Sequence, residues 1–169
     1  GKGNYTKYII KTGAKVIASD ISEKSVELMR KIFNEHRNFT AKTVDMENLP
    51  FENHSFDVLV SAGSLSYGQS VRVLSEIFRV LKKNGNLVIV DSLDDNPIYR
   101  LNRYLHYFSG NRSYSVIKNC PKISLLNEIE KHFSNVETSY YGKMTWAMPI
   151  ISKLTKNPQK ISDFLDQNI

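Results

Sequence analysis

The sequence has few of the features that staple a chain or anchor it in a membrane. Its single cysteine, Cys120, excludes an internal disulfide and fits a reducing compartment. No apolar run approaches the roughly 20 residues that a membrane-spanning helix needs. No residue pattern points to a metal site. We therefore expect a cytoplasmic protein that holds no metal and depends on an ordinary hydrophobic core.

The composition is that of a globular domain. The chain has 169 residues, of which 41% are hydrophobic and 24% charged. Its net charge of +6 would suit an acidic partner, but the lysines are spread along the whole chain. A dispersed basic surface favours solubility over nucleic-acid binding. We expect a small-molecule partner, and the sequence does not indicate an oligomeric state.

Strand-like and helix-like segments alternate along the first half of the chain. Short Val- and Ile-rich runs predict strands at 15–19, 40–44, 56–60 and 86–90. Helical spacing of apolar residues predicts helices at 4–12, after the N-cap residue Ser22, and at 71–81 up to Asn84-Gly85. Such alternation predicts a doubly wound α/β fold with a mostly parallel sheet.

The second half departs from this alternation. Asn96-Pro97 is a strong helix start, and Gly110-Asn111 ends the helix that follows. A further helix is predicted at 124–133, then strands at 136–141 and 143–147 that would form an antiparallel hairpin, and a polar, partly helical tail. We interpret residues 1–169 as a single domain. Its parts are a cofactor-binding core (1–93), a substrate insert or lid (94–121), and a C-terminal helix and strand pair (122–169).

Glycines and an acidic residue suggest a nucleotide-like ligand. Gly1 and Gly3 directly precede a helix, where free backbone N–H groups favour an anion and a glycine lets a ligand approach closely. Asp20 ends the next strand, 17 residues after Gly3. An acidic residue there binds ribose hydroxyls in doubly wound folds. The alternative is that Asp20 only helps Ser22 to start the next helix.

Four segments, in order, resemble the class I (Rossmann-like) S-adenosylmethionine-dependent methyltransferases, in the group of ubiquinone and menaquinone biosynthesis enzymes. Gly1-Lys2-Gly3 is similar to the end of the family's glycine-rich motif, and Ala18 to Ser22 to its acidic motif. Residues 45–51 (DMENLPF) resemble its adenine segment. Residues 55–60 with 81–90 resemble its fourth and fifth strands.

The resemblance implies an enzyme with S-adenosyl-L-methionine as its cofactor, and it implies roles for individual residues. Gly1, Gly3, Ser61 and Ala62 would border the methionine part of the cofactor. Asp20 would bind the ribose, Ile21 and Met46 would sandwich the adenine, and Asp45 would accept a hydrogen bond from its exocyclic amine. Packing in the hydrophobic core is the alternative for Ile21 and Met46.

Two departures from the family pattern matter. Ser66 stands where many relatives have a histidine, so a histidine base at this position is excluded. The family's first strand, which lies centrally in the sheet, is missing from these residues. Because two central strands would otherwise lose a hydrogen-bonding neighbour, we expect at least about 30 further residues before Gly1.

Two alternatives remain. An NAD(P)-dependent short-chain dehydrogenase would use the Tyr114 and Lys118 pair for proton transfer, but Ser92 is 22 residues before Tyr114, too far for that family's serine. The other alternative is a non-catalytic domain that binds the cofactor and serves as a scaffold.

The helix after Asn96 is expected to recognise the acceptor. One face carries Arg100, Arg103 and Tyr107, which suit a carboxylate, phosphate or sugar, and the other face carries an apolar stripe formed by Ile98, Leu101, Leu105 and Phe108. The insert resembles methyltransferases of bacterial surface-polysaccharide gene sets, which implies the hydroxyl of a sugar or polysaccharide precursor as acceptor. His106, Tyr67 or Asp91 could remove the proton of such a hydroxyl.

Overall fold

The structure is a computed structural model that describes residues 1–111, 113–141, 157 and 160. The chain divides into two compact units. We call residues 1–92 with 114–121 the core unit, and residues 93–113 with the chain from 122 onward the helical unit. Each unit is described by itself. In the part of the chain that the structure describes, no helix has the length and apolar character needed to cross a membrane.

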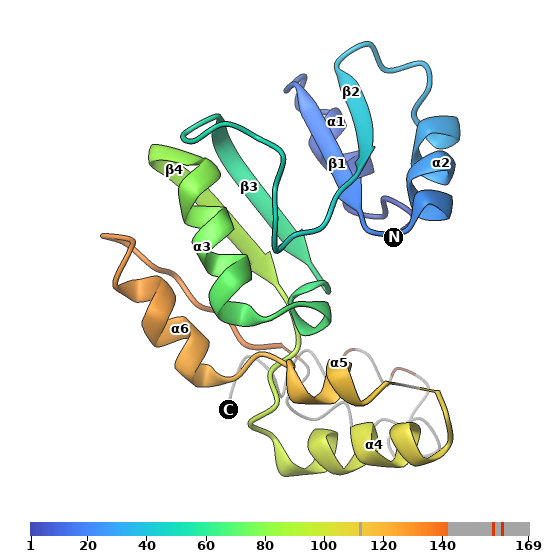
Figure 1. Ribbon diagram of the computed structural model, residues 1–169, viewed down its shortest axis with the longest axis vertical. Coiled ribbons are helices and arrows are strands. Elements are labelled where there is room, and N and C mark those ends of the chain that lie inside the picture. Colours follow the sequence, from blue (N-terminus) through green and yellow to red (C-terminus); the bar gives the residue numbers. More distant parts are fainter. Residues whose placement is uncertain (112, 142–156, 158–159, 161–169) are drawn as a thin grey trace. The chain divides into compact units, whose positions relative to one another are not determined.

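The core unit alternates helices and strands, as the sequence predicts (Figure 1). Its elements are α1 (Thr6–Ile10), β1 (Val16–Asp20), α2 (Glu23–Ile32), β2 (Phe39–Thr43), β3 (Phe56–Ala62), the 3-10 helix η1 (Leu65–Tyr67), α3 (Ser70–Val80), β4 (Leu81–Val90) and α5 (Tyr114–Lys118). Strand β1 pairs with β2 and strand β3 with β4, both in parallel. The prediction of parallel α/β architecture is confirmed, while the helices η1 and α5 were not predicted.

Helix α2 begins as the sequence predicts and covers the β1–β2 pair (Figure 1). Ser22 caps it by accepting a hydrogen bond from the Ser25 N–H. The buried face of α2 presents Val26 and Met29, which form a hydrophobic cluster with Phe33 and with Ala41 of β2. Burial of this cluster is what fixes α2 on the strand pair.

Helix α3 packs on β4 with a strongly buried apolar face, formed by Val73, Leu74, Ile77 and Val80. Two details of the predicted helix differ. Val71 is 83% exposed and lies in the first turn of the helix. The helix ends at Val80, and Leu81 already pairs with Phe56 of β3. Asn84, with φ of +64°, therefore bends the start of a strand and does not close the helix.

The two strand pairs are not hydrogen bonded to one another within the described residues. The family's first strand, which is missing from these residues, is expected between β1 and β3. The predicted hairpin is not confirmed. Residues 136–141 are neither helix nor strand, and 143–147 lie outside the described residues, as does most of the predicted tail.

The helical unit contains α4 (Pro97–Phe108) and α6 (Ile123–Glu130). The Asn96 side chain caps α4 by accepting from the backbone N–H groups of Ile98 and Tyr99, as predicted. Gly110, with φ of +76°, follows its end. The segment before α4 also reaches α6, since the Asp95 carboxylate accepts from the Ile123 N–H at 2.8 Å.

Candidate cofactor site

The two acidic motifs of the core unit end at the same edge of the β1–β2 pair. Register pairs Asp20 with Thr43, and the Val44 N–H donates to the Asp20 carbonyl at 3.1 Å. Ile21 and Asp45 therefore follow neighbouring strand ends. In parallel α/β sheets, ligands bind outside this carboxyl edge. The structure brings these predicted residues together at the edge where a ligand is expected.

The Asp20 carboxylate has two contacts, one for each oxygen. Its Oδ1 accepts from the Ser22 N–H at 2.8 Å, so Asp20 does help to start α2. Its Oδ2 lies against the backbone nitrogen of Gly1, at the start of the glycine segment. The glycine motif and the predicted ribose-binding residue therefore lie side by side.

Gly3 is required by the local packing. Its φ is +73°, a region that residues with a side chain rarely adopt. A Cβ at this position would stand 2.7 Å from Phe33 Cε2 and 3.3 Å from Met29 Cγ. The glycine thus lets the loop lie directly on α2, whereas a Cβ at Gly1 would meet nothing within 4 Å.

The residues assigned to adenine surround this edge with suitable chemistry. Ile21 is 71% exposed, so it is not part of the hydrophobic core. Met46 is half-buried, and Asp45 is exposed. The Asp45 Oδ1 accepts from the Glu47 N–H at 2.9 Å, which fixes the direction of its carboxylate. Two carboxylates and two apolar side chains at one edge fit a nucleoside with a ribose diol and an amino group.

The ends of β3 and β4 form a second predicted segment of the site. The Gly63 N–H donates to the Val90 carbonyl at 2.8 Å and extends the β3–β4 pairing, and the positive φ of Gly63, +65°, lets the chain leave the strand direction. The Ser61 hydroxyl is buried and lies 2.8 Å from the Ser64 hydroxyl. No ligand is needed to explain this contact, and the methionine-binding role of Ser61 and Ala62 stays a prediction.

The candidate proton acceptors differ in how far they are engaged. Asp91 accepts from the Leu65 N–H at 3.0 Å and from the Ser92 N–H at 2.8 Å, so each of its carboxylate oxygens already accepts a hydrogen bond from the backbone. Tyr67 is exposed at the end of η1. His106 is exposed on α4. Asp91 is thus better placed to order the β4–η1 region than to take a proton.

Helix α4 buries one of its predicted acceptor residues. Arg103 is only 7% exposed, and its Nη1 donates to the Asp94 Oδ1 at 2.7 Å, while Nη2 donates to the Leu93 carbonyl at 3.0 Å. Arg100 is exposed and lies 3.6 Å from the other Asp94 oxygen. The acceptor contact of Arg103 stays a prediction, and its burial favours a supporting role.

The predicted apolar stripe of α4 is exposed. Its four members are Ile98, Leu101, Leu105 and Phe108, and Tyr107 is also partly exposed. The α4 side chain that is buried instead is Arg103, which is paired with Asp94 within the helical unit.

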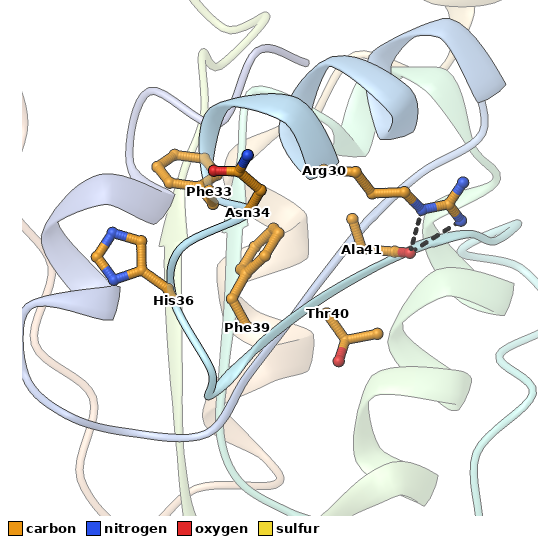
Figure 2. Close-up of a pocket in the computed structure, with 7 residues that line it drawn as sticks. All are labelled: Arg30, Phe33, Asn34, His36, Phe39, Thr40 and Ala41. Atoms are coloured by element: carbon orange, nitrogen blue, oxygen red, sulfur yellow. Dashed lines mark hydrogen bonds between the residues drawn. The ribbon is translucent and has the colours of Figure 1, made fainter.

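A cavity of about 220 Å³ lies at the C-terminal end of α2 (Figure 2). Phe33 and Phe39 line it, with ring centroids 5.1 Å apart, and the Arg30 side chain donates to the Ala41 carbonyl at its rim. Phe39 and Ala41 belong to the first half of β2. The cavity is therefore at the amino end of the strands, away from the edge that carries Asp20.

Sequence reasoning did not single out four charged residues that hold loops in place. Glu76 and Arg79 bind the loop after β2, Glu47 of that loop accepts from the Gln69 N–H, and Asp94 binds Arg103. The pair Glu76 and Arg79 has the i,i+3 spacing of a helical ion pair, which could have drawn attention to it. Their backbone partners could not have been found, because those lie 27 and 30 residues away along the chain.

A parallel α/β core with acidic residues at its strand ends defines a Rossmann-like nucleotide-binding protein. Residues 1–89 match the family described as Methyltransferase domain. The chain belongs to this family, which confirms the methyltransferase resemblance seen in the sequence and supports S-adenosylmethionine as the cofactor. The family match also decides against the short-chain dehydrogenase alternative.

Individual relatives agree with the family. The demethylmenaquinone methyltransferase of Clavibacter sepedonicus is 29% identical over 142 residues, which cover 82% of this chain and 58% of that protein. The ubiquinone/menaquinone biosynthesis C-methyltransferase of Wigglesworthia glossinidia brevipalpis is 34% identical over 98 residues, or 54% of this chain and 39% of the relative. The chain thus spans about half the length of these curated relatives.

Solved structures show the same fold. A methyltransferase homologue from Bacillus halodurans superposes with a TM-score of 0.64 at 25% identity, covering 81% of this chain and 61% of that one. Geranyl diphosphate C-methyltransferase from Streptomyces coelicolor gives a TM-score of 0.63 at 15% identity, covering 78% and 50%. The latter likeness concerns the fold alone.

Proposed function

We propose that this chain is the cofactor-binding part of an enzyme that transfers a methyl group from S-adenosylmethionine to a small-molecule acceptor. The observation that carries the proposal is the position of Asp20 and Asp45 after neighbouring ends of β1 and β2, beside the glycine segment. These are the acceptor groups that a ribose diol and an adenine amine require. Membership of the methyltransferase-domain family supports the same reaction.

Each predicted cofactor residue has a definite task in this proposal. Bound S-adenosylmethionine would supply an electrophilic methyl group on its sulfonium. Asp20 binds the ribose hydroxyls, and Asp45 accepts from the adenine amine. Ile21 and Met46 exclude water from the faces of the adenine ring. Gly1, Gly3, Ser61 and Ala62 leave room for the methionine part.

An acceptor hydroxyl must lose its proton during transfer. His106 and Tyr67 are the remaining candidates, since the Asp91 carboxylate already accepts two backbone N–H groups. An amine acceptor would need no base. Holding the acceptor in line with the methyl group is then the main contribution of the protein.

Residues 96–119 are proposed to recognise the acceptor, through Arg100 and Tyr107 and with Arg103 in support. The hydroxyl of a sugar or polysaccharide precursor suits these polar side chains. The exposed apolar stripe of α4 favours a second candidate, an acceptor with an apolar tail. The names of two relatives, demethylmenaquinone methyltransferase and geranyl diphosphate C-methyltransferase, refer to acceptors of that kind.

The first test is cofactor binding by Asp20→Ala. Loss of a charged acceptor from a hydroxyl pair should weaken S-adenosylmethionine binding by about 1.5–3 kcal/mol, measured by calorimetry. Because Asp20 also accepts from the Ser22 N–H at the start of α2, Ser22→Ala serves as the control that disturbs the helix cap without removing the carboxylate. Equal losses in the two variants would mean that Asp20 supports the helix and does not bind ribose.

The second test is methyl transfer by the full-length protein to sugar nucleotides, to quinol precursors with apolar tails and to small phenols. Transfer to the first class favours the polar acceptor, and transfer to the second favours the apolar one. Cofactor binding without transfer to any compound would favour the scaffold alternative.

A further inference from the structure

Two side chains of α3 bind both polar groups of one backbone residue in the loop after β2. The Glu76 carboxylate accepts from the Leu49 N–H at 2.7 Å, and the Arg79 guanidinium donates to the Leu49 carbonyl at 2.8 Å. The two side chains also bind each other, with Arg79 Nε and Nη2 donating to Glu76 at 2.8 and 2.7 Å. Each side chain therefore holds the other in the conformation that grips Leu49.

The rest of the Arg79 guanidinium acts on the same loop. Its Nη1 donates to the Phe51 carbonyl at 2.7 Å and to the Asn53 side-chain oxygen at 2.9 Å. A planar guanidinium offers five donors in a fixed geometry, which a lysine cannot reproduce. With acceptors at Leu49, Phe51 and Asn53, Arg79 sets the path of residues 49–53.

This loop begins with the residues assigned to adenine. Asp45 accepts from the Glu47 N–H, so its carboxylate direction depends on the course of the loop. The Glu47 side chain in turn accepts from the Gln69 N–H at 2.7 Å and lies 3.6 Å from Arg72 Nη1. The loop is thus attached at two places. Glu47 attaches it to Gln69 and Arg72 at the start of α3, and Glu76 and Arg79 attach it to the last turns of α3 through more hydrogen bonds.

We propose that Glu76 and Arg79 are positioning residues for adenine recognition, holding the 45–53 loop so that Asp45 meets the exocyclic amine of the cofactor. The inference rests on the proposed function, because it takes the adenine end of S-adenosylmethionine as the ligand. Neither side chain touches the cofactor. Both act through the loop backbone, and without them residues 49–53 lose their side-chain hydrogen bonds from α3.

The test compares S-adenosylhomocysteine with S-inosylhomocysteine, which has a carbonyl where adenine has its amine. The full-length wild type is expected to bind the adenosyl ligand about 10- to 100-fold more tightly, the ratio set by one hydrogen bond to a charged group. Asp45→Ala should abolish this preference. Arg79→Ala and Glu76→Gln should each lower it at least about fivefold, and Arg79→Ala added to Asp45→Ala should lower it no further.

Controls separate positioning from general stability. Val80→Ala truncates a fully buried side chain of the same helix that has no polar group to bind the loop, and Lys82→Ala removes an exposed ion pair with Asp57. Both should keep the wild-type preference. If Val80→Ala lowers the preference as much as Arg79→Ala does, or if Arg79→Ala leaves it unchanged, the positioning role is overturned.

Milder variants and the wild type complete the design. Arg79→Lys retains the positive charge but not the planar guanidinium. It should give an intermediate preference for the adenosyl ligand, and it replaces Arg79→Ala if that variant does not fold. A wild type that binds neither ligand contradicts the proposed function itself. A wild type that binds both ligands equally contradicts the adenine role of Asp45 and the positioning role with it.

Discussion

Two arginines organise two regions of this protein in different ways. Arg79 of the core unit is 31% exposed and donates to two backbone carbonyl groups of a loop, to the Asn53 side chain and to Glu76. Arg103 of the helical unit is buried and donates to a buried carboxylate. A partly exposed clamp controls the shape of a loop at little cost in stability, whereas a buried ion pair makes the stability of its region depend on both partners.

The largest expected effect comes from breaking the buried pair. Arg103→Ala leaves Asp94 buried without its main counter-charge, which should destabilise the helical unit by about 3–5 kcal/mol. Hydrogen exchange of the α4 amides, together with denaturant unfolding, measures this loss. Asp94→Ala should be similarly damaging, and the double variant should lose less than the sum of the two.

Arg100→Ala is the matched control for this pair. Arg100 lies on the same helix and 3.6 Å from the same carboxylate, but it is exposed, so its removal should cost less than about 1 kcal/mol. If Arg103→Ala leaves α4 exchange at the wild-type rate but raises the acceptor KM, then Arg103 contacts the acceptor as first predicted and does not act as an anchor.

The next largest effect is expected in the glycine segment of the core unit. Gly3→Ala combines a left-handed backbone with a Cβ placed 2.7 Å from the Phe33 ring. The two costs together should lower the free energy of unfolding by about 2–4 kcal/mol. Gly13→Ala isolates the backbone cost, since its φ is +79° and its Cβ would meet nothing within 4 Å. Thermal unfolding of both variants is the measurement, and equal losses would show that the contact with α2 is not tight.

The local features that sequence could predict are those whose cause is local. Ser22 and Asn96 cap their helices because a short polar side chain reaches the N–H groups of the next turn. Asp20 could be placed at a strand end because the short apolar run before it is also a local signal. The exposure of the α4 stripe could not be foreseen, because helical spacing says which residues share a face but not which face is covered.

The candidate site follows the same division. Gly3 and Asp20 were singled out by their short-range spacing, and Asp45 by the resemblance to the methyltransferases. The clamp of Glu76 and Arg79 was missed because it joins α3 to a loop about 30 residues earlier in the chain. Side chains that bind a distant backbone carry no periodic signal, and only the folded structure brings the partners together.

The smallest expected effect concerns the pH dependence of the core unit's clamp. The hydrogen bond from Arg79 holds the pKa of the Glu76 carboxyl below its usual value. A depressed pKa in the folded state means that the stabilisation is fully present above the unfolded-state pKa of about 4.3 and is lost as the pH falls through the folded-state pKa.

Glu76→Gln removes this titration. Its melting temperature should lie roughly 2–4 °C below that of the wild type at pH 7, and the difference should shrink below about pH 4. Glu128→Gln is the matched control, since Glu128 also pairs with a cation three residues on, Lys131, but at a more exposed position. Its effect should be smaller at every pH. A wild-type difference that grows as the pH falls would mean that Glu76 is bound in its protonated form, and the loop would then be held by Arg79 without an ion pair.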